Sequence, residues 1–340
     1  MLNRDIYNKP PKENRLVNNG VAEVSEDHSE AAQAILRYEL ETFVCNGQYE
    51  KGLETILDKF LRNLDAGTEQ PGVWISGFYG SGKSHLAKML RTLWTDYQFA
   101  DGATARRLTK LPTGVFEHLK ELSTQGKRHG ALHAAAGKLG AGAGDKVRLA
   151  LLGIVFKSKG LPEQYNQAQF ALWMQREGIL PTVEAELKAA GRSLAQELPH
   201  MYVSSHLAKA LLQARPDLAH TEADARKLLK EQFPQVTDVT SEQMTSAIEA
   251  ALAEDDKFPL TLVVLDEVQQ YIGVDAEKAF QVQEVTETLS KHFNGKLLFV
   301  GTGQSALSGM PNLQRLMGRF PIQVMLGDWD VENVTRQIIL

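Results

Sequence analysis

One segment sets the architecture of this chain: Val73-Trp74-Ile75-Ser76-Gly77-Phe78-Tyr79-Gly80-Ser81-Gly82-Lys83-Ser84-His85-Leu86. Its start is a short apolar run typical of a strand, its middle is a glycine-rich turn, and the residues from Ser84 to Trp94 have the apolar spacing of a helix. The turn matches the pattern G-x-x-x-x-G-K-[ST], which forms a phosphate-binding loop where it joins a strand to a helix. The order of elements here is the one that such a loop needs.

The residue types of this turn suit the binding of phosphate groups. Glycine allows backbone conformations closed to residues with a Cβ, so consecutive N–H groups can point inward, and the N-terminus of the next helix adds partial positive charge. Lys83 is expected to reach the β- and γ-phosphates, and the Ser84 hydroxyl to ligate Mg²⁺. The alternative is a strand-to-helix turn that binds nothing. The residues predicted to contact phosphate are Gly77, Phe78, Tyr79, Gly80, Ser81, Gly82, Lys83, Ser84 and His85, the last through its backbone rather than its ring.

The composition bounds the compartment and the partners. The 340 residues carry a net charge of −5 and include a single cysteine, Cys45, so an internal disulfide is impossible. There is no apolar signal core at the start and no run of about 18 apolar residues, so the sequence predicts a cytoplasmic protein without a membrane partner. Contact with DNA would need a partner or a local patch, for which Lys120 to Arg128 and Lys146 to Lys159 are mildly basic; solvated helix faces are the alternative.

The pattern along the chain divides it into five parts. Residues 1–70 are expected to form an N-terminal arm, with a short strand at Gly20 to Val24, and helices that pack on a core. Residues 71–145 form the first part of that core, 146–256 a helical insertion, 257–330 the second part of the core, and 331–340 the start of a lid or C-terminal region. In the insertion, Phe170, Trp173 and Met174 fall on one helical face and are expected to be core side chains.

The core elements follow from apolar runs and periodicity. Near-continuous apolar runs predict strands buried on both faces, as in a parallel sheet. The strands predicted besides the first are Ala131 to Leu139, Pro259 to Asp266, Lys296 to Val300 and Ile322 to Leu326. The helices predicted in the core are Ser29 to Phe43, Tyr49 to Leu64, Ser84 to Trp94, Ala276 to Phe293, Met310 to Met317 and one from Asp330 onward, while the segment 99–144 is otherwise mixed.

Two acids at the end of an apolar strand supply what nucleotide hydrolysis needs opposite a phosphate loop. Asp266 is expected to hold Mg²⁺ and Glu267 to orient and deprotonate an attacking water. Thr302 and Gln304 follow the next strand and are expected to lie between the loop and the acids, near the γ-phosphate. The alternatives are an acidic pair that only ends a strand, and a hydroxyl and an amide that only satisfy a turn.

Two arginines precede the last predicted strand. Arg319 is expected to reach the phosphate of a neighbouring subunit and to stabilise charge in the transition state. Arg315 is a weaker candidate for the same role. For both, a surface or ion-paired arginine is the alternative.

This combination of motifs resembles the ASCE division of P-loop NTPases, in particular AAA+ proteins of the origin-recognition and STAND type. Within that group the whole chain resembles the N-terminal ATPase region of the BrxC/PglY family, the large P-loop proteins of BREX phage-defence systems. Besides the phosphate loop, the segments that carry the resemblance are Leu265-Asp266-Glu267-Val268-Gln269-Gln270-Tyr271, Gly301-Thr302-Gly303-Gln304-Ser305, Asn18-Asn19-Gly20-Val21-Ala22-Glu23-Val24 and Phe43-Val44-Cys45-Asn46-Gly47-Gln48-Tyr49.

The resemblance implies an α/β fold of the AAA+ type with a central parallel sheet, flanking helices and a large helical insertion. It also implies ATP and Mg²⁺ as cofactors, hydrolysis of ATP to ADP and phosphate, a homo-oligomer when full length, and BREX partners that include a methyltransferase and a phosphatase-like protein. Related ATPases contact adenine through a hydrophobic-hydrophobic-Gly-Arg-Glu motif where this chain has Phe43 to Tyr49, and Cys45-Asn46-Gly47 departs from that motif.

Two further departures from the family pattern concern the length of the segments. About 180 residues separate Lys83 from Asp266, more than one helix and one strand require, which is the reason to expect an insertion. The chain stops where a helical lid is expected to begin, so we expect a fragment of a longer protein, with weak hydrolysis on its own.

Three functions are consistent with these residues. The first is an ATPase motor or switch whose hydrolysis changes how subunits pack or act on DNA. The second is a nucleotide-gated scaffold with little turnover that recruits BREX partners through its helical insertion. The third, a P-loop kinase or transferase, fits less well, because such enzymes replace water by an acceptor and usually lack the glutamate found here at Glu267.

Overall fold

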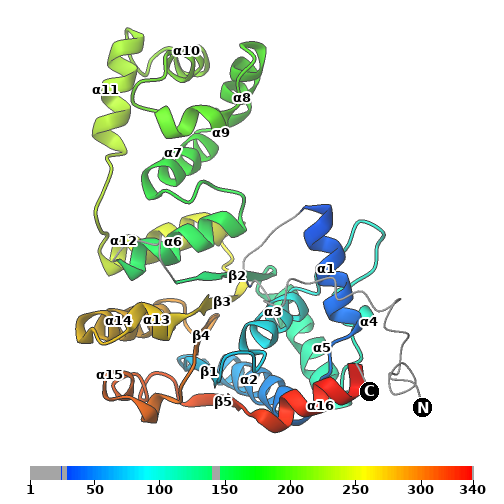
Figure 1. Cartoon of the computed structure of the whole chain (residues 1–340). Helices are drawn as coiled ribbons and strands as arrows, with labels where there is room; N and C mark the ends of the chain where they lie inside the picture. The colour runs from blue at the N-terminus through cyan, green and yellow to red at the C-terminus, as the bar shows by residue number, and fades with distance from the viewer. Residues whose placement is uncertain (1–23, 25–28, 140–145, 339–340) are drawn as a thin grey trace, which may run out of the picture. The chain divides into compact units, whose positions relative to one another are not determined.

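The computed structural model describes residue 24, residues 29–139 and residues 146–338, which fall into two compact units (Figure 1). The first unit joins Met1–Ala143 to Ala253–Leu340, and the second is Gly144–Leu252. The strand expected at Gly20 to Val24, most of the N-terminal arm and the glycine-rich stretch 140–144 lie outside the described residues. In the described part of the chain, none of the helices has both the length and the apolar character needed to cross a lipid bilayer.

A parallel β-sheet forms the centre of the first unit. Its strands among the described residues are β1 (Val73–Gly77), β2 (Leu132–Lys138), β3 (Leu260–Asp266), β4 (Leu297–Gly303) and β5 (Ile322–Leu326). They are hydrogen-bonded in the order β2-β3-β4-β1-β5, and each neighbouring pair runs parallel. The predicted α/β class with a central parallel sheet is confirmed.

The strand order decides which segments meet. β4 lies between β1 and β3, so that Val300 of β4 is aligned with Val73 on one side and with Val264 on the other. Because the strands are parallel, their carboxyl ends lie along the same edge of the sheet, which is where ligands bind in open α/β sheets. The turn after β1 and the acids at the end of β3 therefore share one edge.

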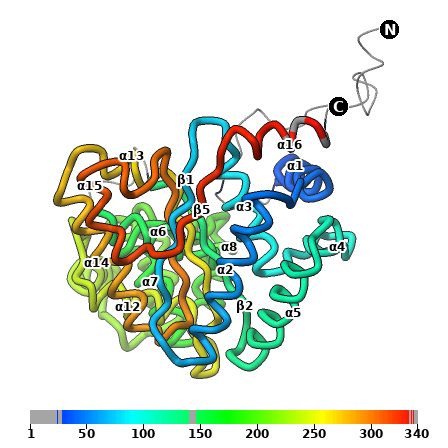
Figure 2. The backbone as a smooth tube through the Cα atoms, turned by 90° about the horizontal axis from the view of Figure 1, so that it is seen from below, coloured from blue at the N-terminus to red at the C-terminus, as the bar shows by residue number. Residues whose placement is uncertain are grey.

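Helices cover both faces of this sheet (Figures 1 and 2). Leu260, Leu262 and Val264 of β3 point into one core, which they share with α2 (Gly47–Ala66) and α3 (Lys83–Trp94). On the other face, α13 (Val268–Ile272) and α14 (Ala276–His292) contact β4. Burial on both faces explains why β3 and β4 are apolar throughout rather than alternating. The other elements of this unit are α1 (Glu30–Glu41), α4 (Ala105–Leu108), α5 (Thr113–Arg128), η3 (Leu307–Gly309), α15 (Pro311–Gln314) and α16 (Asp328–Ile338).

Several elements differ from the sequence prediction, among them α5, α15 and β4. Helix α5 forms in a segment that was expected to be mixed, because Val115, Leu119 and Leu122 give it a narrow apolar face amid polar residues. The helix expected at Met310 to Met317 is reduced to the single turn of α15. β4 continues past its expected end, so that Thr302 belongs to the strand rather than to the turn after it.

Every element in the described part of the second unit is a helix. These are α6 (Val147–Ser158), α7 (Tyr165–Arg176), α8 (Leu180–Ala189), α9 (Leu194–Glu197), η2 (Leu198–His200), α10 (Ser205–Ala214), α11 (Glu222–Gln232) and α12 (Ser241–Leu252). Phe170 and Met174 of α7 are fully buried in the core of this unit, and Trp173 packs against that core with its ring stacked on Phe170. The expectation that these side chains belong to a core is confirmed.

Arg106 of α4 is hydrogen-bonded to the helices α3 and α5. Its replacement by alanine is expected to destabilise the first unit. Its guanidinium donates to the carbonyls of Leu93 (2.7 Å), Trp94 (2.9 Å) and Leu119 (2.8 Å). These carbonyls lie at the end of α3 and inside α5, so their loss of a charged donor should cost about 2 kcal/mol of unfolding free energy. Denaturant unfolding of Arg106→Ala measures this cost.

The neighbouring Arg107 is exposed and provides the matched control. Arg107→Ala should change the unfolding free energy by no more than about 0.5 kcal/mol. If the two variants unfold alike, Arg106 does not hold these helices together.

Candidate functional site

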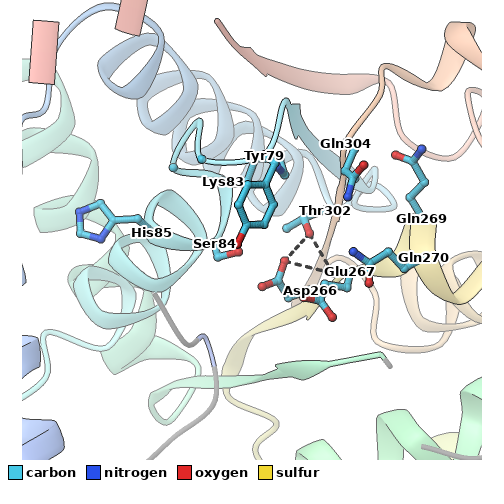
Figure 3. Close-up of a pocket in the computed structure, with 13 residues that line it drawn as sticks. Tyr79, Lys83, Ser84, His85, Asp266, Glu267, Gln269, Gln270, Thr302 and Gln304 are labelled. Atoms are coloured by element: carbon cyan, nitrogen blue, oxygen red, sulfur yellow. Dashed lines mark hydrogen bonds between the residues drawn. The ribbon is translucent and has the colours of Figure 1, made fainter. Parts of the chain in front are cut away.

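A pocket lies at the carboxyl edge of the sheet, where the turn after β1 meets the ends of β3 and β4. Its volume is about 240 Å³. Figure 3 shows Tyr79, Lys83 and Ser84 on one side, with Asp266, Glu267 and Thr302 across from them. The lining residues are Tyr79, Gly80, Gly82, Lys83, Ser84, His85, Asp266, Glu267, Gln269, Gln270, Thr302, Gly303 and Gln304. Most of the residues that the sequence nominated for phosphate and metal binding are therefore neighbours in space.

The turn after β1 is held by close contacts that leave no room for side chains at two positions. A Cβ on Gly77 would lie 2.5 Å from Ser81 Oγ, and one on Gly82 would lie 2.1 Å from the Tyr49 hydroxyl. Gly82 also has a φ of 85°, which favours glycine, and it is the residue from which α3 begins. The first N–H groups of α3 have no partner within the helix, so they are available to an anion at the pocket.

The Lys83 side chain folds back over the turn. Its ammonium donates to the Phe78 carbonyl at 2.9 Å. Burial lowers the pKa of Lys83, and the negative charge of Asp266 opposes that effect in part. The Lys83 ammonium is partly desolvated, and its hydrogen bond goes to a neutral carbonyl. An anionic ligand would stabilise it, because the ligand would neutralise its charge.

Asp266 has an oxygen that the fold leaves without a partner. Asp266 is 2% exposed, and its Oδ1 accepts from the Thr302 hydroxyl and from the Glu267 N–H at 3.0 Å (Figure 3). Its Oδ2 is buried and has no hydrogen-bond partner among the described residues. A buried carboxylate oxygen without a donor is costly, and a cation would compensate for it.

The donors present fit a magnesium ion that is also held by a ligand's phosphates. Mg²⁺ prefers oxygen ligands and is usually bound by one or two protein groups, substrate phosphates and water. The Asp266 carboxylate and the Ser84 hydroxyl line the same pocket and are oxygen ligands of this kind. Among residues 29–139 and 146–338, no cluster of three or more His, Cys, Asp or Glu could hold a metal by itself. The site therefore suits a metal that arrives with a phosphate ligand.

Glu267 adopts a backbone conformation that is unusual for a residue with a side chain. Its φ is 62°, in the left-handed region, and it caps the start of α13. Hydrogen bonds from its N–H to Asp266 Oδ1 and Thr302 Oγ1, each 3.0 Å long, fix this turn. Its carboxylate lies 3.7 Å from the ammonium of Lys138 at the end of β2. The turn thus places a second carboxylate in the pocket beside Asp266.

The tip of β4 fills the space between the loop and the acids. Thr302 is 1% exposed and makes hydrogen bonds to Asp266 and Glu267, whereas Gln304 is exposed at the pocket. The Gln269 amide oxygen accepts from the Ser305 N–H at 2.8 Å and so fixes the turn that carries Gln304. Thr302 therefore supports the two acids, Asp266 and Glu267, whereas the exposed side chain of Gln304 can contact a ligand in the pocket.

Two residues that line the pocket, and one that pairs with a lining residue, were not singled out from the sequence as site residues. Gln269 and Gln270 lie in α13 directly after the acids, and Figure 3 shows Gln270 beside Glu267. Lys138 pairs with Glu267 although it belongs to the strand before the helical unit. The sequence does contain a signal for Lys138: it is a lysine at the end of the buried strand β2. The neighbouring strand β3 ends in acids, so an ion pair between the two strand ends could have been expected.

His85 and Phe78 of the predicted phosphate loop lie differently from the residues that face the two acids. The His85 ring points away from the acid cluster (Figure 3) and packs edge-on against Phe43, with 5.4 Å between ring centroids. Burial lowers the pKa of His85, so the ring is neutral at pH 7. Phe78 is part of the turn but, like Gly77 and Ser81, does not line the pocket, and its side chain is 41% exposed.

Arg319 lies at the opposite edge of the sheet from the pocket. Its carbonyl accepts from the N–H of Gly72, which precedes β1, whereas the pocket is at the carboxyl end of that strand. Its guanidinium pairs with Glu287 of α14 at 2.7 Å, and Arg315 is exposed nearby in the sequence. Arg319 therefore does not serve the pocket of its own chain, and its action on a neighbouring subunit stays a prediction.

No known family model matches this chain. What the site can do therefore rests on its own chemistry: a backbone cradle at a helix N-terminus, a lysine, two oxygen ligands for a divalent cation, and a carboxylate next to them. Together these groups can bind the phosphates of a nucleotide and accept a proton from a water molecule.

Proposed function

We propose that the chain binds ATP with Mg²⁺ and hydrolyses it to ADP and phosphate. The observation that carries this proposal is the meeting, in one pocket, of the glycine-rich turn, the unpartnered carboxylate oxygen of Asp266 and the second carboxylate of Glu267. A phosphate-binding turn alone would serve any phosphate ligand. The acids add a metal ligand and a base, which are the parts that hydrolysis needs in addition.

Each residue has a distinct task in this mechanism. The N–H groups of the turn and the Lys83 ammonium would bind the β- and γ-phosphates, and Ser84 and Asp266 would hold the metal. The bound Mg²⁺ would neutralise charge on the phosphates. Glu267 accepts a proton from water as the water oxygen bonds to the γ-phosphorus and the bond from that phosphorus to the β–γ bridging oxygen breaks, which releases ADP. Thr302 keeps both carboxylates in place through its hydrogen bonds.

We also propose that the chain acts in a BREX anti-phage complex as an AAA+-like subunit of the BrxC/PglY family. The motif combination in the sequence supports this, together with the position of β4 between the loop-bearing and acid-bearing strands. In this view the protein works in the cytoplasm as a homo-oligomer. ATP binding and hydrolysis are coupled to the assembly or DNA-directed action of a methyltransferase and a phosphatase-like protein, with Arg319 supplied to a neighbouring subunit.

The second candidate function is a nucleotide-gated scaffold with little turnover. Two contacts favour it: Lys138 engages the carboxylate of Glu267, and Glu287 engages Arg319 away from the pocket. Both groups that hydrolysis would use are thus occupied in this structure. A scaffold would bind ATP as tightly as an ATPase does and would differ from it only in the rate of hydrolysis.

The direct test measures ATP binding and hydrolysis by the chain at increasing protein concentration. We expect tight binding that needs Mg²⁺, and a turnover per molecule that rises with concentration because a neighbouring Arg319 completes the site. Binding with negligible turnover at every concentration would favour the scaffold. Failure to bind ATP at all would contradict the proposal as a whole.

Replacing Lys138 by methionine is expected to raise ATP turnover modestly. The Lys138–Glu267 pair competes with any water for the carboxylate, but its two side chains are 39% and 35% exposed. A pair this exposed is worth at most about 1 kcal/mol, so turnover should rise no more than about fivefold. Steady-state hydrolysis and ATP affinity are measured together, and the affinity should not change. A tenfold or larger fall in turnover would show that Lys138 takes part in the reaction.

A further inference from the structure

The underside of the glycine-rich turn rests on the side chain of Tyr49, a residue of the first turn of α2. Tyr49 is 4% exposed, and its hydroxyl donates to the carbonyl oxygen of Ser81 at 2.8 Å. That carbonyl belongs to the peptide bond between Ser81 and Gly82, in the centre of the turn. Gly82 lines the pocket, whereas Tyr49 does not. The hydroxyl thus contacts the turn without forming part of the pocket wall.

This hydrogen bond fixes the orientation of one peptide group in the turn. A trans peptide is planar, and its C=O and N–H point in opposite directions. Because the Ser81 carbonyl points to the Tyr49 hydroxyl, the N–H of Gly82 in the same peptide points in the opposite direction. Glycine at a φ of 85° can rotate more freely than other residues, so this peptide needs an external contact to stay in one orientation.

Tyr49 is itself held by its surroundings. Its ring packs edge-on against Phe43, with 6.0 Å between centroids, and Phe43 packs in the same way on His85. Burial, followed by the negative charge of Asp330, raises the pKa of Tyr49 to about 12, so its hydroxyl remains a donor at any working pH. The ring and the hydroxyl are therefore fixed relative to the turn.

Asp330 of α16 fixes the start of the helix that carries Tyr49. It is 3% exposed, and its Oδ1 accepts from the Gln48 N–H at 3.0 Å while its Oδ2 accepts from the Gly327 N–H at 2.9 Å. A Cβ on Gly47 would lie 2.9 Å from Asp330 Oδ1, so the carboxylate is seated against the backbone at the N-terminus of α2. A carboxylate at a helix N-terminus is favourable in energy.

We infer that Tyr49 is a positioning residue for phosphate binding: its hydroxyl keeps the Ser81–Gly82 peptide in the orientation that presents the Gly82 N–H to a phosphate, and Asp330 positions Tyr49. The inference rests on the proposed function, because it concerns how the same turn binds phosphate. It adds a link between the site and α16. A shift of α16 that moved Asp330 would reach the turn through Tyr49.

The test is Tyr49→Phe, which removes the hydroxyl and keeps the ring that packs on Phe43. The affinities for ATP and for inorganic pyrophosphate, each with Mg²⁺, are measured by calorimetry for the wild type and the variant. Both should fall by the same factor, about threefold to tenfold, because one hydrogen bond that orders the cradle is lost. In steady-state hydrolysis the KM for ATP should rise by a similar factor, with kcat nearly unchanged.

Tyr202→Phe is the matched control. The Tyr202 hydroxyl also donates to a backbone carbonyl, that of Phe233, but it lies in the helical unit. This variant should bind ATP and pyrophosphate as the wild type does. Denaturant unfolding of both variants separates a loss of stability from a loss of phosphate affinity. Should Tyr49→Phe not fold, Asp330→Asn provides a second route, with an expected loss of about twofold to threefold in pyrophosphate affinity.

The binding measurements separate failure of the positioning role from failure of the proposed function. Equal loss for ATP and pyrophosphate in a folded Tyr49→Phe protein supports the positioning role. If the folded variant binds pyrophosphate as tightly as the wild type does, the role is overturned, even when ATP binding is weaker, and the proposed function is untouched. If the wild type binds neither ATP nor pyrophosphate, the proposed function fails and the positioning role fails with it.

Discussion

Replacing Glu267 by glutamine is expected to lower ATP turnover by a factor of about 10² to 10⁴ and to leave ATP binding intact. The amide has nearly the same shape as the carboxylate but cannot accept a proton from water. The turn at this residue should survive, because it is fixed by the backbone N–H of Glu267, which donates to Asp266 and Thr302. Losing the ion pair with Lys138 should cost little, since both side chains are more than a third exposed.

Single-turnover hydrolysis and equilibrium ATP binding measure these two quantities separately. Glu277→Gln is the matched control, because Glu277 is exposed in α14 and does not line the pocket. Its turnover should equal that of the wild type. If Glu267→Gln hydrolyses ATP at more than a tenth of the wild-type rate, Glu267 is not the base, and the acid pair serves only to bind metal. If the wild type itself has negligible turnover, the scaffold is favoured and the variant will only show retained binding.

Replacing Lys83 by alanine is expected to weaken ATP binding by a factor on the order of a hundred, and turnover will fall with it. The ammonium is the one side-chain cation among the described residues that line the pocket. Its pKa is lowered by burial, so its charge is already poorly solvated and contributes more to an anionic ligand than a surface lysine would. The protein should remain folded, because the hydrogen bond that is lost goes to the exposed turn residue Phe78.

ATP titration with Lys83→Ala and with Lys120→Ala gives the comparison. Lys120 is an exposed lysine of α5 whose ion pair with Glu117 is long, at 3.7 Å, so its removal should change neither ATP affinity nor stability. An affinity for ATP within threefold of the wild type in Lys83→Ala would contradict the assignment of the glycine-rich turn to the triphosphate. Weaker binding by both variants would point instead to a general effect of positive charge.

Local sequence determined the elements of the site. The apolar runs before Gly77 and before Asp266, and the run that leads to Thr302, are strands because each fits a backbone buried on both faces. The turn from Gly77 to Ser84 follows from its glycines, since a Cβ at Gly77 or Gly82 would collide with neighbouring atoms. These features depend on a few neighbouring residues, so their signal is complete within a short window of sequence.

Helical periodicity also determined the helices of the second unit, where Phe170 and Met174 are buried as their spacing predicted. The same spacing is present in α5, at Val115, Leu119 and Leu122, although that segment was expected to be mixed. The local pattern did not determine the end of β4, where Thr302 interrupts the apolar run but is buried by its hydrogen bond to Asp266. At the end of β4 the contacts made by neighbouring elements outweigh the local pattern.

Only the tertiary structure decided which residues share the pocket. The placement of β4 between β1 and β3 and the contact of Lys138 with Glu267 both depend on the lateral order of strands that are distant in sequence. The same holds for Tyr49, which meets the turn from α2, and for Asp330, which contacts the start of α2 from a helix near the other end of the chain. No short segment carries this information, because it arises from how the connections cross the sheet and pack against one another.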